Sequence, residues 1–372
     1  MAEMVTRGVI VDGAREAGFD PDGLRDAFGL LETWVEQEVL PGAAALVARG
    51  GRIAGEAYVG LAHRGQRRPV DSATIWSLAS ISKPFTATAV MLLVEEGALS
   101  LDEPLGQLLP EFLRAPETPF DRRAVTLRHV LAHCSGLPGF SEDNVALRKM
   151  HRPLEDFVRS FGRQPLLFAP GAAHYYSNCG ILLAAEAVGR ALAGTLGQNV
   201  ETPAVRRLHG FVQERILGPL GMASSSFLPP AEWDERIAWV ERTGQEGNDW
   251  EMANSAYYRG LGIPWGGMFS TPRELARFVD LFLPAAGGCQ RIGPPLPNGA
   301  AGLRVVSPAT ARAMTSVQFA PPDAPADLAP ELRDVAPPMR PQPAVAWGIG
   351  WEIKGRKRPH RSGELTSPTT YG

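Results

Sequence analysis

The sequence predicts an α+β fold in which an antiparallel sheet flanked by helices is interrupted by a large helical lobe. Three observations lead to this prediction: an early helix followed by two strands, a long middle section with helical periodicity, and a late strand. A chain of 372 residues can bury the core of such a domain. We therefore expect a single domain over residues 1–372, with a sheet lobe at 20–75 and 300–372 and a mainly helical lobe at 76–299.

The first element is predicted to be an amphipathic helix. Asp20-Pro21 is typical of an N-cap followed by a proline in the first helical turn, and the pattern ends near Pro41-Gly42. The apolar residues that recur at helical spacing are Leu24, Phe28, Leu31, Trp34 and Val35. Residues 43–49 and 52–61 then predict two strands joined as a hairpin at Gly50-Gly51.

The middle of the chain is mostly helical by pattern, and few strand signals interrupt it. We expect helices over residues 125–133, 154–161, 180–192, 207–218, 272–283 and 307–317. Residues 321–343 are rich in proline and predict an extended loop without regular structure. Residues 347–354 predict a strand.

Charge and composition narrow the class of partner. The net charge is −3, and acidic and basic residues are interspersed, so there is no basic surface for nucleic acid and no polybasic patch for a membrane. No stretch approaches the roughly 20 apolar residues of a membrane span. We therefore expect a small-molecule substrate, while the oligomeric state stays open.

The N-terminus and the cysteines predict a cytoplasmic protein. Residues 1–20 carry several charges and no apolar core of signal-peptide length. The three cysteines, Cys134, Cys179 and Cys289, are an odd number at wide spacing, which fits neither a disulfide framework nor a zinc site. We expect reduced thiols and no metal.

The most informative stretch places Ser80 and Lys83 three residues apart before a long apolar run. In a helix or helical turn, residues i and i+3 lie on one face, so the serine hydroxyl and the lysine amine can come within hydrogen-bonding reach. Only four of the 37 basic residues are lysines, and lysine, unlike arginine, can have its pKa lowered enough to take part in proton transfer. A serine beside such an amine is a candidate nucleophile.

Pro84 places this pair at the start of a helix. Proline is tolerated in the first helical turn and disrupts the interior, so Ser80 must lie at or just before the helix start. Unpaired backbone N–H groups there stabilise negative charge. The alternative is a helix cap followed by a surface lysine.

A second group of polar residues follows Pro170-Gly171. A phenol such as that of Tyr176 can relay a proton if a lysine lowers its pKa, and Asn178 can donate to a substrate carbonyl or accept from Lys83. The alternative is a tyrosine packed at a turn, with asparagine capping the next helix. Tyr175 is the alternative candidate for the role of Tyr176 if the position of this tyrosine is shifted by one residue.

Seven motifs, in one order along the chain, resemble those of a known superfamily. They are IWSLASISK (75–83), LSLDEPL (99–105), TLRHVLAHCSGL (126–137), PG (170–171) with YSN (176–178), GPLGM (218–222), GGMFST (266–271) and WGIGW (347–351). The sequence resembles the serine β-lactamase and penicillin-recognising superfamily, most closely the class C β-lactamase-like branch that includes esterases, aminopeptidases and acyltransferases. The resemblance covers roughly residues 24–351 and implies the β-lactamase-like fold.

The resemblance implies roles for the residues in these motifs. It makes Ser80 the acylated nucleophile and Lys83 with Tyr176 the proton-transfer pair, and it leaves open which of the two is the formal base. Asn178 would hold Lys83 or the substrate. No cofactor is implied.

Several residues in or beside these motifs have both a structural and a functional interpretation. Trp265 and Gly267 either line the substrate pocket, where glycine allows a close approach of the backbone, or form a turn before the helix at 272–283. His129 and His133 flank the end of an apolar helix, and the resemblance indicates structural positions for them. Cys134 and Cys179 are expected to be buried, inert thiols.

The sequence departs from the superfamily at its third motif. That motif, Lys-Thr-Gly or His-x-Gly, lies on a late strand which supplies the second oxyanion donor. Only His360-Arg361-Ser362-Gly363 approaches it, with one residue too many. We therefore expect a chain truncated before that strand, with the following strands and helix missing, an exposed sheet edge and weakened turnover.

The function expected from these observations is that of a serine hydrolase acting through an ester on Ser80, with small carboxylic esters as substrates. β-Lactam hydrolysis, or D-amino-acid peptidase or acyltransferase activity, would use the same residues. A third possibility is a catalytically silent binding module of the same fold, which the missing third motif favours for this chain.

Overall fold

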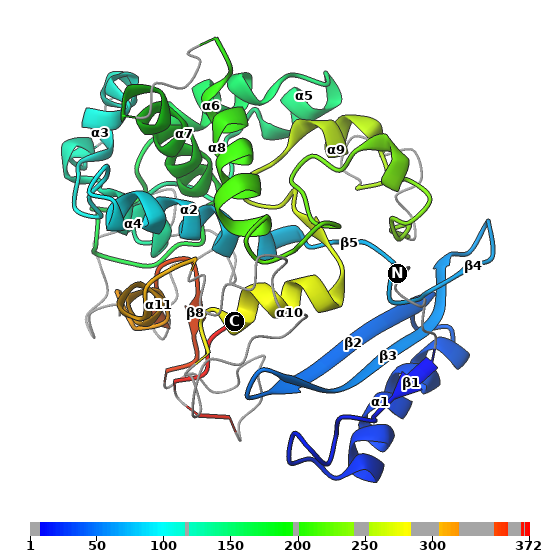
Figure 1. The fold of residues 1–372 in the computed structure, drawn as a ribbon. Coiled ribbons are helices and arrows are strands. Elements are labelled where there is room, and N and C mark those ends of the chain that lie inside the picture. Colours follow the sequence, from blue (N-terminus) through cyan, green and yellow to red (C-terminus); the bar gives the residue numbers. More distant parts are fainter. Residues whose placement is uncertain are drawn as a thin grey trace. The chain divides into compact units, whose positions relative to one another are not determined.

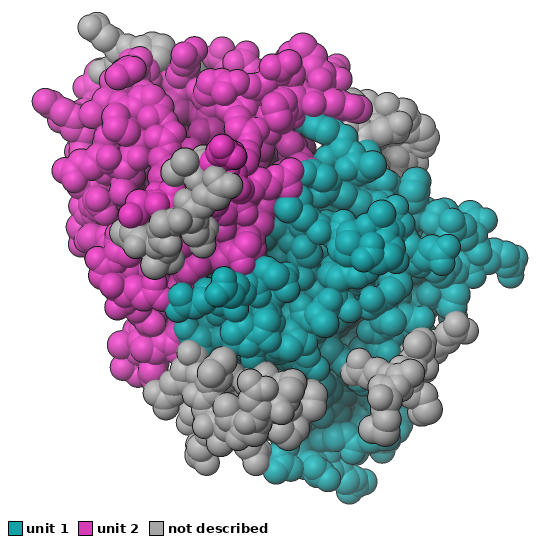
Figure 2. All heavy atoms as spheres, turned by 45° about the horizontal axis from the view of Figure 1, so that its top comes forward, with its two compact units in different colours: residues 1–78, 213–260, 267–305 teal, residues 79–212, 261–266, 306–372 magenta. Residues whose placement is uncertain are grey.

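The computed structural model describes residues 8–115, 119–195, 201–241, 253–283, 305–319, 346–355, 366–367 and 369–372. The chain divides into two compact units, each built from several segments (Figure 2). Unit 1 comprises residues 1–78, 213–260 and 267–305, and unit 2 comprises residues 79–212, 261–266 and 306–372. The expected sheet-lobe segment 20–75 lies in unit 1, whereas 306–372 groups with the helices of unit 2.

Unit 1 contains an antiparallel sheet (Figure 1). Its strands are β1 (Gly8–Ile10), β2 (Gly42–Arg49), β3 (Arg52–His63) and β4 (Arg68–Pro69), in the order β1-β3-β2 with β4 paired to β3. The hairpin predicted at Gly50-Gly51 is confirmed, and both glycines have the positive φ that such a tight turn requires (57° and 74°).

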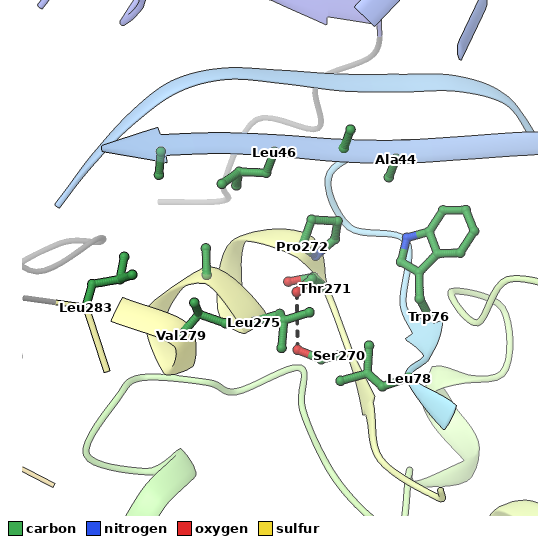
Figure 3. A pocket seen from close by; sticks show the side chains of 13 residues that line it. Ala44, Leu46, Trp76, Leu78, Ser270, Thr271, Pro272, Leu275, Val279 and Leu283 are labelled. Carbon is green, nitrogen blue, oxygen red and sulfur yellow. Dashed lines mark hydrogen bonds between the residues drawn. The ribbon is translucent and has the colours of Figure 1, made fainter. Parts of the chain in front are cut away.

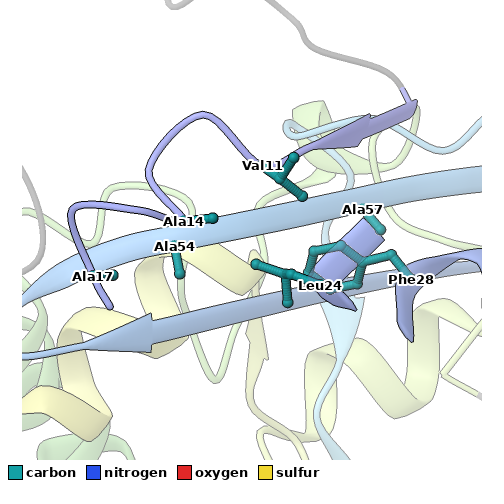
Figure 4. Packing of buried hydrophobic residues seen from close by; sticks show 7 residues of the cluster. All are labelled: Val11, Ala14, Ala17, Leu24, Phe28, Ala54 and Ala57. Carbon is teal, nitrogen blue, oxygen red and sulfur yellow. The ribbon is translucent and has the colours of Figure 1, made fainter. Parts of the chain in front are cut away.

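Helix α1 (Pro21–Glu36) packs on this sheet, as the sequence predicts. Its start is fixed by Asp20, whose carboxylate accepts a hydrogen bond of 2.9 Å from the Gly23 amide. A side chain at Gly55 of β3 would come within 2.9 Å of both Leu24 and Phe28, so glycine allows the close approach of the helix. The buried cluster between helix and sheet consists of Val11, Ala14, Ala17, Leu24, Phe28, Ala54 and Ala57 (Figure 4).

The remaining elements of unit 1 are short. They are β5 (Trp76–Ser77), a π-helical turn (Gln213–Leu217), a 3₁₀ turn (Ala231–Trp233), α9 (Ala256–Leu261), β6 (Phe269–Ser270) and α10 (Pro272–Asp280). Strands β5 and β6 pair antiparallel. Helix α10 confirms the prediction for 272–283, and the Thr271 hydroxyl caps it by accepting from the Glu274 amide at 3.3 Å.

Unit 2 is mainly helical. Its helices are α2 (Lys83–Glu95), α3 (Leu105–Leu108), α4 (Leu127–Leu131), α5 (Asn144–Lys149), α6 (Leu154–Gly162), α7 (Asn178–Thr195), α8 (Ala204–Val212) and α11 (Pro308–Met314), with 3₁₀ turns at Ala79–Ser82, Pro110–Arg114 and Arg122–Ala124. The helices predicted at 154–161, 180–192 and 307–317 are confirmed. The one predicted at 125–133 is shorter, and the one at 207–218 is α8 continued by the π-helical turn.

Helix α2 lies at the centre of unit 2. Every residue from Lys83 to Leu93 is buried, and the helix packs against α7 and α8. A helix that is apolar on all sides needs such enclosure. Across the described residues, none of the helices combines the length and the apolar character needed to cross a membrane.

The single strand predicted over residues 347–354 is wrong. The chain instead forms a hairpin of β7 (Ala346–Trp347) and β8 (Glu352–Ile353). Gly350 turns with φ 76°, its amide donates to the Leu131 carbonyl at 3.2 Å, and a side chain there would lie 2.5 Å from Ala87 Cβ. Contacts with α2 and α4, which no local pattern encodes, therefore impose the turn. The proline-rich segment 321–343 lies outside the described residues.

Candidate active site

Ser80 lies in the 3₁₀ turn Ala79–Ser82 that leads directly into α2. Ala79, just before it, has a left-handed φ of 45°, which is uncommon for a residue with a side chain. Backbone strain of this kind is typical of functional sites. The turn leaves Ser80 exposed at the N-terminal end of a buried 13-residue helix.

Lys83 is the first residue of α2, and its amine is held beside the serine. Its Nζ lies 3.0 Å from Ser80 Oγ and donates to the Trp265 carbonyl at 2.8 Å. Only 3% of Lys83 is exposed, and this burial lowers the pKa of the amine to about 7. A substantial fraction of the lysine is therefore neutral near pH 7.

The Trp265 carbonyl belongs to a turn that α2 itself holds in place. The Gly266 amide donates to the Ile263 carbonyl at 3.2 Å, which closes the turn. Thr86, one helical turn after Lys83, donates to the Pro264 carbonyl at 2.8 Å. Two adjacent main-chain carbonyls are thus bonded to one face of α2, which fixes the acceptor of the lysine.

The side chain of Trp265 is buried. Its ring is 4% exposed and packs against the Phe161 ring, with the centroids 5.4 Å apart. Gly267, the other residue predicted to contact substrate, is buried and belongs to unit 1. Residues 264–266 form a turn, and a substrate contact of Trp265 or Gly267 stays a prediction.

Tyr176 meets Lys83 through the face of its ring. Lys83 Nζ lies 4.6 Å from the ring centroid, within the range of a cation–π contact. Tyr176 is 36% exposed, so this part of the site is open to solvent. Tyr175, the substitute in the sequence analysis, is more buried, and this burial raises the pKa of its phenol.

Asn178 begins α7, and its main-chain amide donates to the Gly139 carbonyl at 3.0 Å. It is 6% exposed, and its Oδ1 has no hydrogen-bond partner among the described residues. The described hydrogen bonds of Lys83 go to Ser80 and Trp265, not to Asn178. The structure therefore joins Ser80, Lys83, Tyr176 and the Trp265 carbonyl, and Asn178 lies two residues after Tyr176 in the sequence.

Two aromatic residues beside Tyr176 were not expected at the site. The ring centroid of His133 lies 4.5 Å from that of Tyr176, and the centroid of Trp347 lies 5.8 Å from it. Both belong to motifs of the resemblance, TLRHVLAHCSGL and WGIGW. Those motifs are the one signal in the sequence that pointed to them.

The thiols near the site lie in environments that disfavour the reactive thiolate form. Cys134 and Cys179 are buried and form no disulfide. Burial raises the pKa of Cys134 to about 12 and moves the pKa of Cys179 well above its usual range. Within the described ranges, no group of histidine, cysteine or acidic residues is arranged to hold a metal ion.

An apolar cavity of about 420 Å³ lies in unit 1 (Figure 3). Its lining comes from β2, β5 and α10 and includes Leu46, Trp76, Leu78, Leu275, Val279 and Leu283. Ser270 is among the few polar side chains there, and its hydroxyl bonds to Ser225 and to the Thr271 carbonyl. The lining includes none of the site residues predicted from the sequence.

The arrangement around Ser80 suits acyl transfer. A neutral amine within hydrogen-bonding distance of an exposed hydroxyl can take its proton as the oxygen attacks a carbonyl. The N-terminal end of α2 lies beside the same hydroxyl and favours negative charge. The stretch His360-Arg361-Ser362-Gly363, the nearest approach to a third motif, lies outside the described residues.

Comparison with known proteins gives matches over most of the chain. Residues 29–372 match the family model described as Beta-lactamase. The chain is 37% identical over 190 residues to the Esterase EstB of Burkholderia gladioli, a match that covers 46% of this chain and 47% of the esterase. It is 26% identical over 230 residues to the D-alanyl-D-alanine-carboxypeptidase/endopeptidase AmpH of Escherichia coli K12, covering 59% of this chain and 53% of that protein.

Solved structures support the fold. A family VIII carboxylesterase superimposes with a TM-score of 0.66 at 20% sequence identity, over 95% of this chain and 84% of that chain. The β-lactamase-like fold predicted from the sequence is thereby confirmed. The chain spans about half the length of the two curated relatives.

Proposed function

Because the chain belongs to the beta-lactamase family, whose members are serine hydrolases, we propose that it hydrolyses small carboxylic esters through an acyl-enzyme on Ser80. The observation that carries this proposal is the 3.0 Å contact between Lys83 Nζ and Ser80 Oγ, with the amine buried and its pKa lowered to about 7. Nucleophile and base are thus in one place and in usable protonation states.

In the first half of the reaction, neutral Lys83 takes the hydroxyl proton while Ser80 Oγ forms a bond to the ester carbonyl carbon. The N-terminal end of α2 stabilises the negative oxygen of the tetrahedral intermediate. When the intermediate collapses, the bond to the alkoxy oxygen breaks and the Lys83 ammonium returns its proton to that oxygen. An alcohol leaves, and the acyl group stays on Ser80.

In the second half, water attacks the acyl-enzyme and Lys83 takes a proton from the water. The bond from the acyl carbon to Ser80 Oγ breaks, the ammonium gives the proton to Oγ, and a carboxylic acid is released. The Tyr176 ring stabilises the transient ammonium through its face, while the Trp265 carbonyl keeps Nζ pointed at the serine. Asn178 is proposed to contact the substrate, because its Oδ1 is left without a partner in the described structure and can accept a hydrogen bond from a donor group of the substrate.

Esters are the preferred substrates in this proposal because the curated relative with 37% identity is an esterase. The relative AmpH supports a second candidate, in which the same pair acts on a D-alanyl amide, and the description of the family, Beta-lactamase, adds a β-lactam to this candidate. Amide and lactam substrates require more effective general-acid catalysis by the Lys83 ammonium, because the leaving nitrogen must be protonated.

The test is covalent labelling followed by substrate comparison. Purified protein is treated with a fluorophosphonate probe, and its intact mass and peptide map are measured beside those of Ser80→Ala. We expect one adduct on Ser80 and faster turnover of p-nitrophenyl esters than of nitrocefin. Labelling or esterase activity that survives in Ser80→Ala would refute the mechanism, and faster nitrocefin turnover would favour the second candidate. A folded protein with neither adduct nor turnover would favour a silent binding module.

A further inference from the structure

His133 is the one fully buried imidazole that touches Tyr176 among the described contacts. It follows α4 and has a left-handed φ of 55°, a region that is uncommon for residues other than glycine and in which histidine is enriched. The mechanism above gives this residue no task.

Both main-chain amides that flank Tyr176 donate to His133. The Tyr175 amide donates to the His133 carbonyl at 2.9 Å, and the Ser177 amide donates to its Nδ1 at 3.1 Å. Since Nδ1 accepts a hydrogen bond, the neutral ring carries its proton on Nε2. One residue, through its main chain and its side chain, therefore sets the backbone on both sides of the phenol.

The ring of His133 also packs against the phenol ring itself. The two planes are inclined by 35° with the centroids 4.5 Å apart. Trp347 lies edge-on to the imidazole at 4.6 Å, and His174 lies edge-on at 6.1 Å. These neighbours enclose the imidazole, so it forms a fixed wall for Tyr176.

The charges around the ring agree with this role. Burial, followed by the nearby His174 and Lys83, holds the pKa of His133 well below its usual range. A protonated ring would lose its Nδ1 acceptor and would place a second positive charge near Lys83. His133 is therefore neutral in the working enzyme.

We propose that His133 is a positioning residue, which holds the Tyr176 ring against the Lys83 amine through the two flanking amides and through its own ring. The proposal rests on the function proposed for Ser80 and adds a residue that acts through Tyr176 without touching the substrate. A displacement of about 1 Å at a reacting group can lower a rate by about 100-fold.

Two variants separate the two contacts. His133→Phe keeps an aromatic ring and loses the acceptor, whereas His133→Asn keeps a short acceptor, tolerates the left-handed backbone and loses the ring. We expect each to slow fluorophosphonate labelling of Ser80 by about 10- to 100-fold. Phe112→Leu, a fully buried ring whose described partner is Arg122, is the control for general destabilisation and should label like the parent. Variants that label within about threefold of the parent would overturn the proposal.

A double-mutant comparison shows whether His133 acts through Tyr176. In a Tyr176→Ala background, His133→Asn should slow labelling no further. Additive losses would overturn the proposal, because they would show that His133 acts independently of the phenol.

Two measurements do not depend on Ser80 chemistry. Nitration of Tyr176 by tetranitromethane should be several-fold faster in His133→Asn and unchanged in Phe112→Leu. In the unaltered protein, ¹⁵N NMR should show an unprotonated Nδ1 on His133, and a protonated Nδ1 would overturn the proposal even if no variant folds. If the parent is not labelled at Ser80 but these two results hold, the function proposed above fails and the positioning role stands.

Discussion

The pH dependence of Ser80 modification should follow the titration of Lys83. Burial lowers the pKa of this amine from 10.5 to about 7, which at 1.36 kcal/mol per pH unit corresponds to roughly 5 kcal/mol in favour of the neutral form. With a pKa of about 7, the neutral fraction rises from about one tenth at pH 6 to about nine tenths at pH 8. An exposed lysine would be neutral about 1,000-fold less often at pH 7.

The assay is the rate of fluorophosphonate labelling, followed by intact mass between about pH 5.5 and 9. We expect a rate that rises about tenfold from pH 6 to pH 8 and then levels off, because in the proposed mechanism neutral Lys83 takes the proton of the attacking hydroxyl. The signal of Ser80→Ala at each pH corrects for non-specific reaction of the probe. A flat profile, or a rate that still rises steeply at about pH 9, would refute the assignment of Lys83 as the base.

The same titration predicts a stability change of known sign. Between about pH 7 and 10.5 the unfolded chain binds a proton on Lys83 that the folded chain does not bind. The contribution of this group to the free energy of unfolding is therefore fully present above about pH 10.5 and is lost as the pH falls to about 7.

Three further variants or treatments have defined outcomes. Lys83→Arg should slow labelling by at least about 100-fold, because a guanidinium does not give up its proton. Its circular dichroism spectrum should be unchanged. A labelling rate within about threefold of the parent would exclude a base at this position. Gly350→Ala should lower the free energy of unfolding in urea by about 1–3 kcal/mol, because the new Cβ would lie 2.5 Å from Ala87 Cβ at φ 76°; an unchanged midpoint would contradict the described packing of the turn. Iodoacetamide at about pH 8 should modify neither Cys134 nor Cys179 in the folded protein, because burial raises the pKa of both thiols. In guanidinium chloride it should modify both, as read by peptide mapping. Modification of the folded protein would place these thiols at the surface.

The contact between Ser80 and Lys83 could be predicted because it is local. Three residues of spacing and a proline after the lysine define a helical start, and the amine then lies beside the hydroxyl. The hydrogen bond from Lys83 to the Trp265 carbonyl could not be predicted. It joins positions 182 residues apart. Its acceptor is a main-chain carbonyl, which every residue carries, so the residue type at this position does not reveal it.

Periodicity predicted which elements form, but not how much of each is covered. The apolar stripe of α1 includes Leu24, Phe28 and Trp34, yet the first two are buried and Trp34 is 42% exposed. The sequence predicts one strand over residues 347–354, whereas the chain turns at Gly350, which contacts α2 and α4. The local sequence pattern indicates which secondary structure a segment prefers, but contacts with neighbouring elements determine the structure that it adopts.

The enclosure of α2 ties the chemistry of Ser80 to the folding of unit 2 as a whole. No residue from Lys83 to Leu93 reaches solvent to an appreciable extent, so its amides should exchange hydrogen only when the unit unfolds. Lys83, the proposed base, is therefore fixed within this enclosed helix. Under the function proposed above, variation in acyl specificity is expected at exposed residues, of which Ile81, Phe140 and Tyr176 are examples in unit 2.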